Sequence, residues 1–243
     1  MGIKLFTFGR RRDDMSVDEF NAYWRDVHVA KLADEPTLRR HVRRFELNHR
    51  LPEDYARDQY RPAEAGAGYD GVAVLWFDSM DAFQAMLAEP AHAAVAEDGA
   101  NFREDAQLLV FTRDADVIVD NGDRSEAGAK MVCILRHNAA LDLPTYHEHW
   151  LNHHGGLFQT IPELNEPLIA YDQNHGLDLP GAAYDGVTEQ WFRDYGAFLE
   201  SMNVESFDKV VNPDTAYFLD GPSIEFIMAG PPTVVIDDGG TER

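Results

Sequence analysis

The segment 20–28 reads FNAYWRDVH, and the segment 146–154 reads YHEHWLNHH. At an offset of 126 residues (146 − 20), the tryptophans of the two segments coincide, and so do their last histidines. Self-similarity at a fixed offset is the sequence signature of a repeated structural unit. These segments therefore indicate that the chain contains two copies of one fold.

Further matches extend the repeat along the chain in the same order. They pair Asn48-His49 with Asn174-His175, the YDGV at 69–72 with the YDGV at 184–187, and Trp76 with Trp191. The offset falls from 126 to 115 (184 − 69) between the first pair and the second. We place the extra residues of the first copy in a Pro-, Glu-, Asp- and Gly-rich loop at 50–68, and we predict a tandem duplication.

The joint between the copies is polar and contains glycine, as a linker does. We predict a first unit at 1–120, a linker at 121–129, a second unit at 130–237 and a frayed tail at 238–243.

Each copy shows the pattern β-α-β-β-α-β. In the first copy, Ser16 and Glu19 form a capping box that opens a helix with apolar residues at helical spacing as far as about residue 33. The other predicted strands are 3–8, 42–47, 72–77, 108–111, 131–135, 168–171, 187–192 and 224–228, and the other predicted helices are 79–87, 143–158 and 195–201. This order is that of the ferredoxin-like fold.

A unit of this kind has helices on one face of its sheet, and the bare face needs a partner. Two fused units can press these faces together. The predicted fold class is therefore α+β, with two fused ferredoxin-like βαββαβ units forming an intramolecular dimeric α+β barrel. Because fusion supplies the sheet partner internally, we expect a homodimer to form only through helices or loops.

The composition excludes several classes of partner. The chain has 21 Lys and Arg residues against 43 Asp and Glu residues, for a net charge of −22, so we expect it to bind neither nucleic acid nor membrane. Its one cysteine, Cys133, lies in an apolar run and is expected to be a small buried core residue. The N-terminus lacks a signal-peptide pattern and no apolar run is long enough to span a membrane, so the expected location is the cytoplasm.

The pattern E-F-x-x-Y-W-x-x-x-H at 19–28 resembles the signature of the EthD family, within the dimeric α+β barrel superfamily. The YDGV segment at 69–72, followed by Trp76, resembles the second conserved block of that family. The two copies cover nearly all of the chain, which is therefore similar to a tandem EthD protein. The second copy departs from the signature, because His149 stands where the first copy has Tyr23, so the two pockets need not be equivalent.

The resemblance implies a pocket for a small molecule and a superfamily whose reactions range widely. They include those of polyketide dehydratases and cyclases, lactone isomerases, cofactor-free monooxygenases and haem enzymes. We predict a cofactor-free lyase, dehydratase or isomerase that acts on a hydrophobic molecule of aromatic, polyketide-like or terpenoid-like type by histidine general acid–base catalysis. Two alternatives stay open: a haem- or oxygen-dependent oxidoreductase or monooxygenase, and a non-catalytic small-molecule-binding accessory protein of a catabolic pathway.

Histidine suits a general base because its ordinary pKa lies near neutral pH. His28 and His154 recur near the end of the first helix of each copy, and the second copy has more titratable neighbours, so we favour His154. A structural role at the helix end is the alternative for both. The complete set of predicted catalytic residues is His154, His28, His175, His49, His149, Tyr184 and Tyr69.

The residues predicted to contact substrate surround these positions. They are Trp24, Trp150, Tyr23, Asn48, Asn174, Trp76 and Trp191. In a strand, neighbouring residues point to opposite faces, so one member of each Asn-His pair faces inward. The alternatives are turn chemistry for the asparagines and core packing for the tryptophans.

His149 and His153 share a helix face at spacing i, i+4 and could ligate a metal ion. No carboxylate follows at the spacing of a zincin motif, and the first copy has Tyr23 and Val27 at the equivalent positions. The sequence alone therefore predicts neither a metal nor another cofactor.

Overall fold

The computed structural model of the chain describes residues 2–55, 68–104 and 107–238. The predicted loop at 50–68 lies mostly outside these residues, and so does the predicted tail, apart from Asp238. The chain divides into two compact units, which are described one at a time. The first unit comprises 1–50, 61–113 and 232–243, and the second comprises 51–60 and 114–231.

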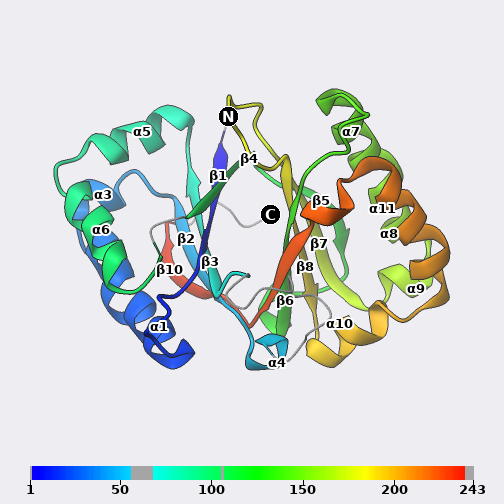
Figure 1. Cartoon of the computed structure of the whole chain (residues 1–243), viewed down its shortest axis with the longest axis horizontal. Coiled ribbons are helices and arrows are strands. Elements are labelled where there is room, and N and C mark those ends of the chain that lie inside the picture. Colours follow the sequence, from blue (N-terminus) through cyan, green and yellow to red (C-terminus); the bar gives the residue numbers. More distant parts are fainter. Residues whose placement is uncertain (1, 56–67, 105–106, 239–243) are drawn as a thin grey trace. The chain divides into compact units, whose positions relative to one another are not determined.

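The first unit is built on an antiparallel sheet of five strands (Figure 1). In chain order the strands are β1 (Ile3–Gly9), β2 (Arg44–His49), β3 (Gly71–Phe77), β4 (Leu108–Arg113) and β10 (Thr233–Asp237). Their order in the sheet is β10-β2-β3-β1-β4, so the first four strands have the ferredoxin-like arrangement.

The helices of the first unit connect these strands. They are α1 (Val17–Tyr23), η1 (Trp24–His28), α2 (Val29–Ala33), α3 (Pro36–Arg39), α5 (Met80–Ala88), α6 (His92–Asp98) and the short η3 (Gly99–Asn101). The predicted capping box is present at the start of α1, where the Ser16 hydroxyl accepts from the Glu19 amide and the Glu19 carboxylate accepts from the Ser16 amide. Segments α1, η1 and α2 run on as one helix.

The second unit repeats this plan with its own five strands. They are β5 (Asp116–Asp120), β6 (Ala129–Leu135), β7 (Leu168–His175), β8 (Gly186–Phe192) and β9 (Glu225–Ala229), in the order β5-β7-β8-β6-β9. The helices and turns grouped with it are α4 (Pro52–Tyr55), η4 (Arg124–Glu126), α7 (Leu143–Glu148), η5 (His149–His154), α8 (Gly155–Thr160), α9 (Pro162–Asn165), α10 (Tyr195–Ser201), η6 (Phe207–Val211), α11 (Asn212–Phe218) and η7 (Gly221–Ser223). Two fused ferredoxin-like units of α+β class are thus confirmed, while their closure into a barrel stays a prediction.

Strands β5 and β10 were not predicted, because the repeated four-strand pattern left no place for the short apolar runs 117–119 and 233–236. Each lies at the edge of a sheet, β10 beside β2 and β5 beside β7. Each covers a strand edge that would otherwise expose unpaired backbone groups. β5 lies in the predicted first range, 1–120, but belongs to the second compact unit. β10 lies in the predicted second range, 130–237, but belongs to the first compact unit.

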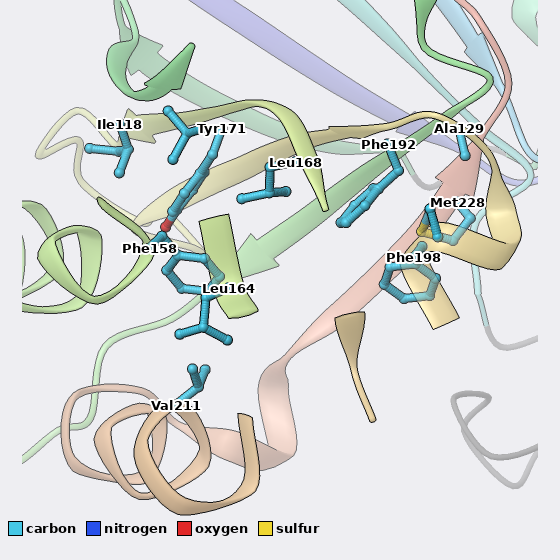
Figure 2. Packing of buried hydrophobic residues seen from close by; sticks show 12 residues of the cluster. Ile118, Ala129, Phe158, Leu164, Leu168, Tyr171, Phe192, Phe198, Val211 and Met228 are labelled. Atoms are coloured by element: carbon cyan, nitrogen blue, oxygen red, sulfur yellow. The ribbon is translucent and has the colours of Figure 1, made fainter. Parts of the chain in front are cut away.

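The core of the second unit lies between its sheet and its helices (Figure 2). Tyr171 and Leu168 project from β7 toward Phe158 and Leu164, and Val211 of η6 packs below them. These side chains are at most 7% exposed, so the helices that carry the polar residues described next are fixed against the sheet.

Candidate active site at the aspartate-paired histidines

The first helix of each unit contains a π-helical turn at the same place in the repeat. The amide of Val29 donates to the carbonyl of Trp24, and the amide of Gly155 donates to the carbonyl of Trp150, both five residues back. Such a turn brings residues five apart onto one side of the helix, and π turns are frequent at functional sites. It places Tyr23 above His28 in the first unit. The sequence predicts regular α-helical spacing here, which the π turn interrupts.

Asp98, at the end of α6, is the acceptor that these two side chains share. Its Oδ2 accepts a hydrogen bond from His28 Nδ1 at 2.8 Å, and its Oδ1 accepts one from the Tyr23 hydroxyl at 2.9 Å. The Lys31 ammonium lies 3.1 Å from Oδ1, and the Asp98 side chain is 3% exposed. The ring of Phe102 covers the His28 ring at a centroid distance of 4.7 Å.

The charges of this pair define a tautomer. Burial alone would raise the pKa of Asp98, but hydrogen bonds from His28, Tyr23, Asn101 and Lys31 lower it to about 2. An ionised carboxylate can only accept hydrogen bonds, so His28 Nδ1 carries a proton. Burial lowers the pKa of His28, and Asp98 opposes this only in part. At neutral pH the ring is therefore uncharged, with its lone pair on Nε2, which is the form required of a general base.

The second unit repeats the arrangement around Asp214 of α11. Asp214 Oδ2 accepts from His154 Nδ1 at 2.7 Å, and Oδ1 accepts from His149 Nε2 at 2.7 Å. His149 therefore bonds the carboxylate oxygen that corresponds to the one bonded by Tyr23. Burial lowers the pKa of His154 against the opposing effect of Asp214. His153 Nε2 also lies 3.3 Å from Asp214 Oδ1.

Neither Asp98 nor Asp214 was among the predicted site residues, although a signal exists. The pattern D-x-A-x-F occurs at 98–102 and again at 214–218, at an offset of 116 (214 − 98). In both copies its phenylalanine, Phe102 or Phe218, packs on the paired histidine. The helices that carry these aspartates lie beyond the second helix predicted in each copy, so the predicted elements do not include them.

Trp24 and Trp150 hold the first helices against the sheets. Trp24 is 3% exposed and packs on Gly71, which opens β3. Trp150 is 0% exposed and packs on Gly186, which opens β8. A Cβ at Gly71 would lie 2.7 Å from Trp24, and one at Gly186 would lie 2.4 Å from Trp150. The glycine of each YDGV motif is therefore needed for close packing. A substrate contact for the two tryptophans stays a prediction.

His49, which ends β2, and His175, which ends β7, lie beside these tryptophans. The His49 ring is 5.8 Å from the Trp24 ring, and the His175 ring is 4.5 Å from the Trp150 ring. Both ring nitrogens of His49 are buried without a hydrogen-bond partner among the described residues, and burial lowers its pKa to about 4. His175 Nδ1 lies 2.7 Å from Nδ1 of His147.

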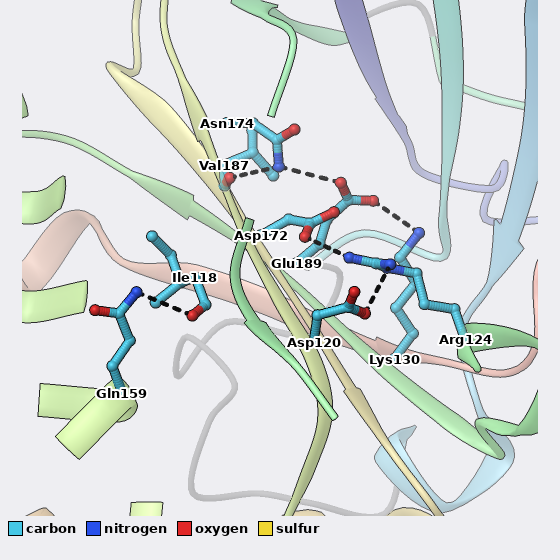
Figure 3. Close-up of polar contacts among 9 residues, drawn as sticks. All are labelled: Ile118, Asp120, Arg124, Lys130, Gln159, Asp172, Asn174, Val187 and Glu189. Atoms are coloured by element: carbon cyan, nitrogen blue, oxygen red, sulfur yellow. Dashed lines mark hydrogen bonds and ion pairs between the residues drawn. The ribbon is translucent and has the colours of Figure 1, made fainter. Parts of the chain in front are cut away.

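Four of the predicted substrate-contact residues bond a separate set of partners. They are Asn48, Asn174, Trp76 and Trp191. Asn174 Nδ2 donates to the carbonyl of Val187 at 2.9 Å and to Glu189 at 3.1 Å (Figure 3). Glu189 in turn pairs with Lys130 at 2.7 Å, and the Lys130 ammonium lies over the Trp191 ring. In the first unit Asn48 Nδ2 donates to the carbonyl of Val72, and Lys4 lies over the Trp76 ring.

This polar network lies on the opposite face of the strand from His175, because neighbouring strand residues alternate. Figure 3 draws this network in the second unit and, as a separate group, the pairing of Arg124 with Asp172 at 2.8 Å. The predicted site residues thus divide between two faces of each sheet.

Tyr69 and Tyr184, predicted as proton donors, occupy matching places before β3 and β8. The Tyr69 ring packs on Phe8 and under the Arg10 guanidinium. The Tyr184 hydroxyl donates to Glu225 at 3.4 Å, and its ring lies under Arg136. A role for either tyrosine as a proton donor stays a prediction.

The sequence profile of the EthD domain matches this chain twice, at residues 12–106 and 138–222. The chain belongs to the EthD family. The first match contains His28 and Asp98, and the second contains His154 and Asp214, so the repeated pair lies inside the two EthD domains.

Solved structures share the fold over the whole chain. An anthrone oxidase-like protein is 6% identical with a TM-score of 0.66, and the match covers 100% of this chain and 96% of that one. A proposed monooxygenase from Fusobacterium nucleatum is 9% identical with a TM-score of 0.59, over 100% and 96% of the two chains. Another, from Lactobacillus acidophilus, is 10% identical with a TM-score of 0.55, over 99% and 98%. At such identities the likeness shows the fold alone.

A search of curated proteins gave no match. Among the described helices, none combines the length and the hydropathy needed to cross a bilayer.

Proposed function

We propose that the chain is an enzyme that moves a proton on a small hydrophobic molecule, with His28 as the first candidate for the general base and His154 as its counterpart. The observation that carries the proposal is the histidine–aspartate pair, which occurs at matching places in both units with Nδ1 to Oδ2 distances of 2.8 and 2.7 Å. Two pairs of such similar geometry, each on a π turn, are difficult to explain by helix capping alone.

The sequence favoured His154, and the structure moves the preference to His28. In the second unit three histidines surround one carboxylate, whereas in the first unit His28 is the one histidine bonded to Asp98 among the described contacts, beside Tyr23, Asn101 and Lys31. The side chains of His28 and His154 are 15% and 10% exposed. Each ring can therefore be approached only over a small part of its surface.

In the proposed reaction, the Nε2 lone pair of His28 takes a proton from an activated C–H of the substrate. The imidazolium that forms is stabilised by the ionised Asp98, as the carboxylate of a catalytic triad stabilises its histidine. The substrate carbanion then expels a leaving group, which takes the proton from His28 as it departs, as in a lyase or dehydratase, or receives the proton back at another carbon, as in an isomerase. In both cases His28 returns to its neutral state.

The second candidate function is an oxidation by molecular oxygen. It is favoured by the names of the similar structures, which include an anthrone oxidase-like protein and a proposed monooxygenase. The first step would be the same deprotonation at His28, and dioxygen would then oxidise the resulting carbanion. The two candidates therefore differ in what consumes the anion and agree on the base.

A haem-dependent reaction fits the described residues less well. A buried carboxylate on Nδ1 is a usual partner of a metal-ligating histidine. However, the rings of Phe158 and Phe218 lie 5.3 and 4.9 Å from the ring of His154, and its side chain is 10% exposed. A macrocycle at this ring would require these side chains to move, so we derive no step through haem.

The test is a screen of aromatic, polyketide-like and terpenoid-like compounds with purified protein, read by mass spectrometry with and without oxygen. A product isomeric with the substrate, or lighter by a small leaving group, supports the first candidate. Oxygen-dependent gain of oxygen supports the second, and a Soret band in the purified protein would support haem. Binding of a compound without turnover, by wild type and by His28→Ala alike, would favour the accessory-protein alternative.

A further inference from the structure

Three side chains of the second unit surround one point with the donor atoms of a transition-metal site. His149 Nε2, His153 Nε2 and a carboxylate oxygen of Asp214 lie within 4.8 Å of one another. The two nitrogens are 2.7 and 3.3 Å from the same oxygen, Asp214 Oδ1. We infer that His149, His153 and Asp214 bind a divalent transition-metal ion, such as Zn²⁺ or Co²⁺. This inference does not depend on the proposed function.

The spacing of the atoms agrees with this coordination. Zinc binds imidazole nitrogen and carboxylate oxygen at about 2.0–2.2 Å, so ligand atoms around one ion lie about 3–3.6 Å apart. Small side-chain shifts would bring the three atoms to these separations. Imidazole and carboxylate together suit zinc and its neighbours better than magnesium or calcium, which prefer oxygen ligands alone.

The supporting contacts hold two of the ligands in place. Asp214 Oδ2 accepts from His154 Nδ1 at 2.7 Å, which orients the carboxylate, and the ion would replace the proton that His149 Nε2 donates to Oδ1. The His149 ring packs against the rings of Tyr217 and Phe218 at 4.9 and 5.1 Å. The Asp214 side chain is 7% exposed and that of His149 18%.

The third ligand gives the site its opening. The His153 side chain is 62% exposed, so the ion can enter from solvent and retain a water molecule as its fourth ligand. The acidic chain, with a net charge of −22, attracts cations to its surface.

The first unit provides a natural comparison, because it has Tyr23 and Val27 at the positions of His149 and His153. Its tyrosine bonds Asp98 as His149 bonds Asp214, yet Tyr23 and Val27 supply no imidazole. The double substitution His149→Tyr with His153→Val therefore copies an arrangement that already exists in this chain.

The experiment uses tag-free, chelator-treated full-length protein and titrates it with Co²⁺ and Zn²⁺ alone. Calorimetry should give one ion per chain, and Co²⁺ should develop visible absorption bands of nitrogen- and oxygen-bound metal. Saturating Zn²⁺ should raise the melting temperature of the wild type, because an ion that binds only the folded state stabilises it. The double variant should lose all three signals, and His153→Val alone should weaken binding at least about tenfold.

His137→Gln is the matched control, because His137 also pairs with a carboxylate, Asp185 at 2.7 Å, and should bind the ion as the wild type does. Absence of binding by the wild type at micromolar metal would overturn the inference. Equal binding by the wild type and His153→Val would also overturn it, even if the double variant failed to fold.

Discussion

A single buried carboxylate determines which nitrogen of its histidine is free to react. Asp98 and Asp214 each bond Nδ1 of a histidine and, through their second oxygen, the side chain five residues before it. The two units differ at this second bond, where a tyrosine hydroxyl in one corresponds to an imidazole in the other. Together with the replacement of Val27 by His153, this difference separates the proposed proton-transfer site from the proposed metal site.

Asp98→Asn should abolish most of the activity attributed to His28. The amide cannot stabilise the imidazolium, so we expect kcat to fall on the order of a hundredfold or more once a substrate is known. Glu97→Gln, an exposed neighbour on the same helix, should retain full kcat. Equal rates for Asp98→Asn and wild type would remove Asp98 from the mechanism.

His49 should make the folded state sensitive to mild acid. Its pKa is lowered to about 4, mainly by burial, against 6.5 when exposed, so the unfolded chain binds a proton that the folded chain excludes. The stability associated with neutral His49 is present above pH 6.5 and is lost as the pH falls toward 4. This amounts to about 2 kcal/mol between pH 7.5 and pH 5.

Urea unfolding of wild type and His49→Phe at both pH values measures this difference. The variant should lose less stability on acidification than the wild type by about that amount. A parallel loss in both proteins would show that His49 titrates normally in the folded state.

Among the structural elements, the first helix of each unit was predicted most completely, and the elements that follow the second helix least. Apolar spacing and the Ser16 capping box define the first helix, and the repeat locates it twice. The π turn inside it, which brings two side chains to one oxygen pair of Asp98 or Asp214, is not encoded in the local periodicity.

Helices α6 and α11 carry those aspartates and show how far the sequence could be used. Their large apolar residues are few, so the helical pattern is weak, whereas the D-x-A-x-F motif repeats at 98–102 and 214–218. Histidines 28, 49, 154 and 175 were predicted on the correct elements because they repeat. Their partners were missed, because a contact between residues 70 or 60 positions apart cannot be read from one sequence.

The close contact between β8 and the helix that carries Trp150 should leave no room for a side chain at Gly186. Gly186→Ala places a methyl group 2.4 Å from Trp150, and repacking of this kind costs about 1–3 kcal/mol. Gly156→Ala meets nothing within 4 Å inside α8, so it should be neutral or stabilising by about 0.5–1 kcal/mol. Thermal unfolding distinguishes them, and equal melting temperatures for the two variants would contradict the packing described.

On the scale of the whole molecule, the C-terminal strand stabilises the N-terminal unit. β10 pairs with β2, and its Ile236 is 1% exposed while Val234 is 46% exposed. Ile236→Ala should cost about 2–4 kcal/mol, and Val234→Ala much less. Hydrogen exchange should show the loss first in β2, and unchanged protection of that strand in Ile236→Ala would contradict the pairing.

Duplication predicted the number of units and the order of the four strands in each. β5 and β10 lie at matching places after the fourth strand of each copy, at an offset of 117 (233 − 116), so they belong to the repeat although the four-strand ferredoxin-like pattern does not contain them. The barrel and any homodimer stay predictions, which a crystal structure can examine together.

The most direct test of the central claim needs no substrate. Long-range ¹H–¹⁵N correlation spectra of the histidine rings, recorded from pH 5 to pH 8, report the tautomer and pKa of His28, assigned with His28→Ala. We predict a neutral ring at pH 7 with the proton on Nδ1 and a pKa below 6.5, and loss of that fixed tautomer in Asp98→Asn. A ring protonated on Nε2 at pH 7, or a pKa above 6.5, would contradict the account of His28 as a general base held by Asp98.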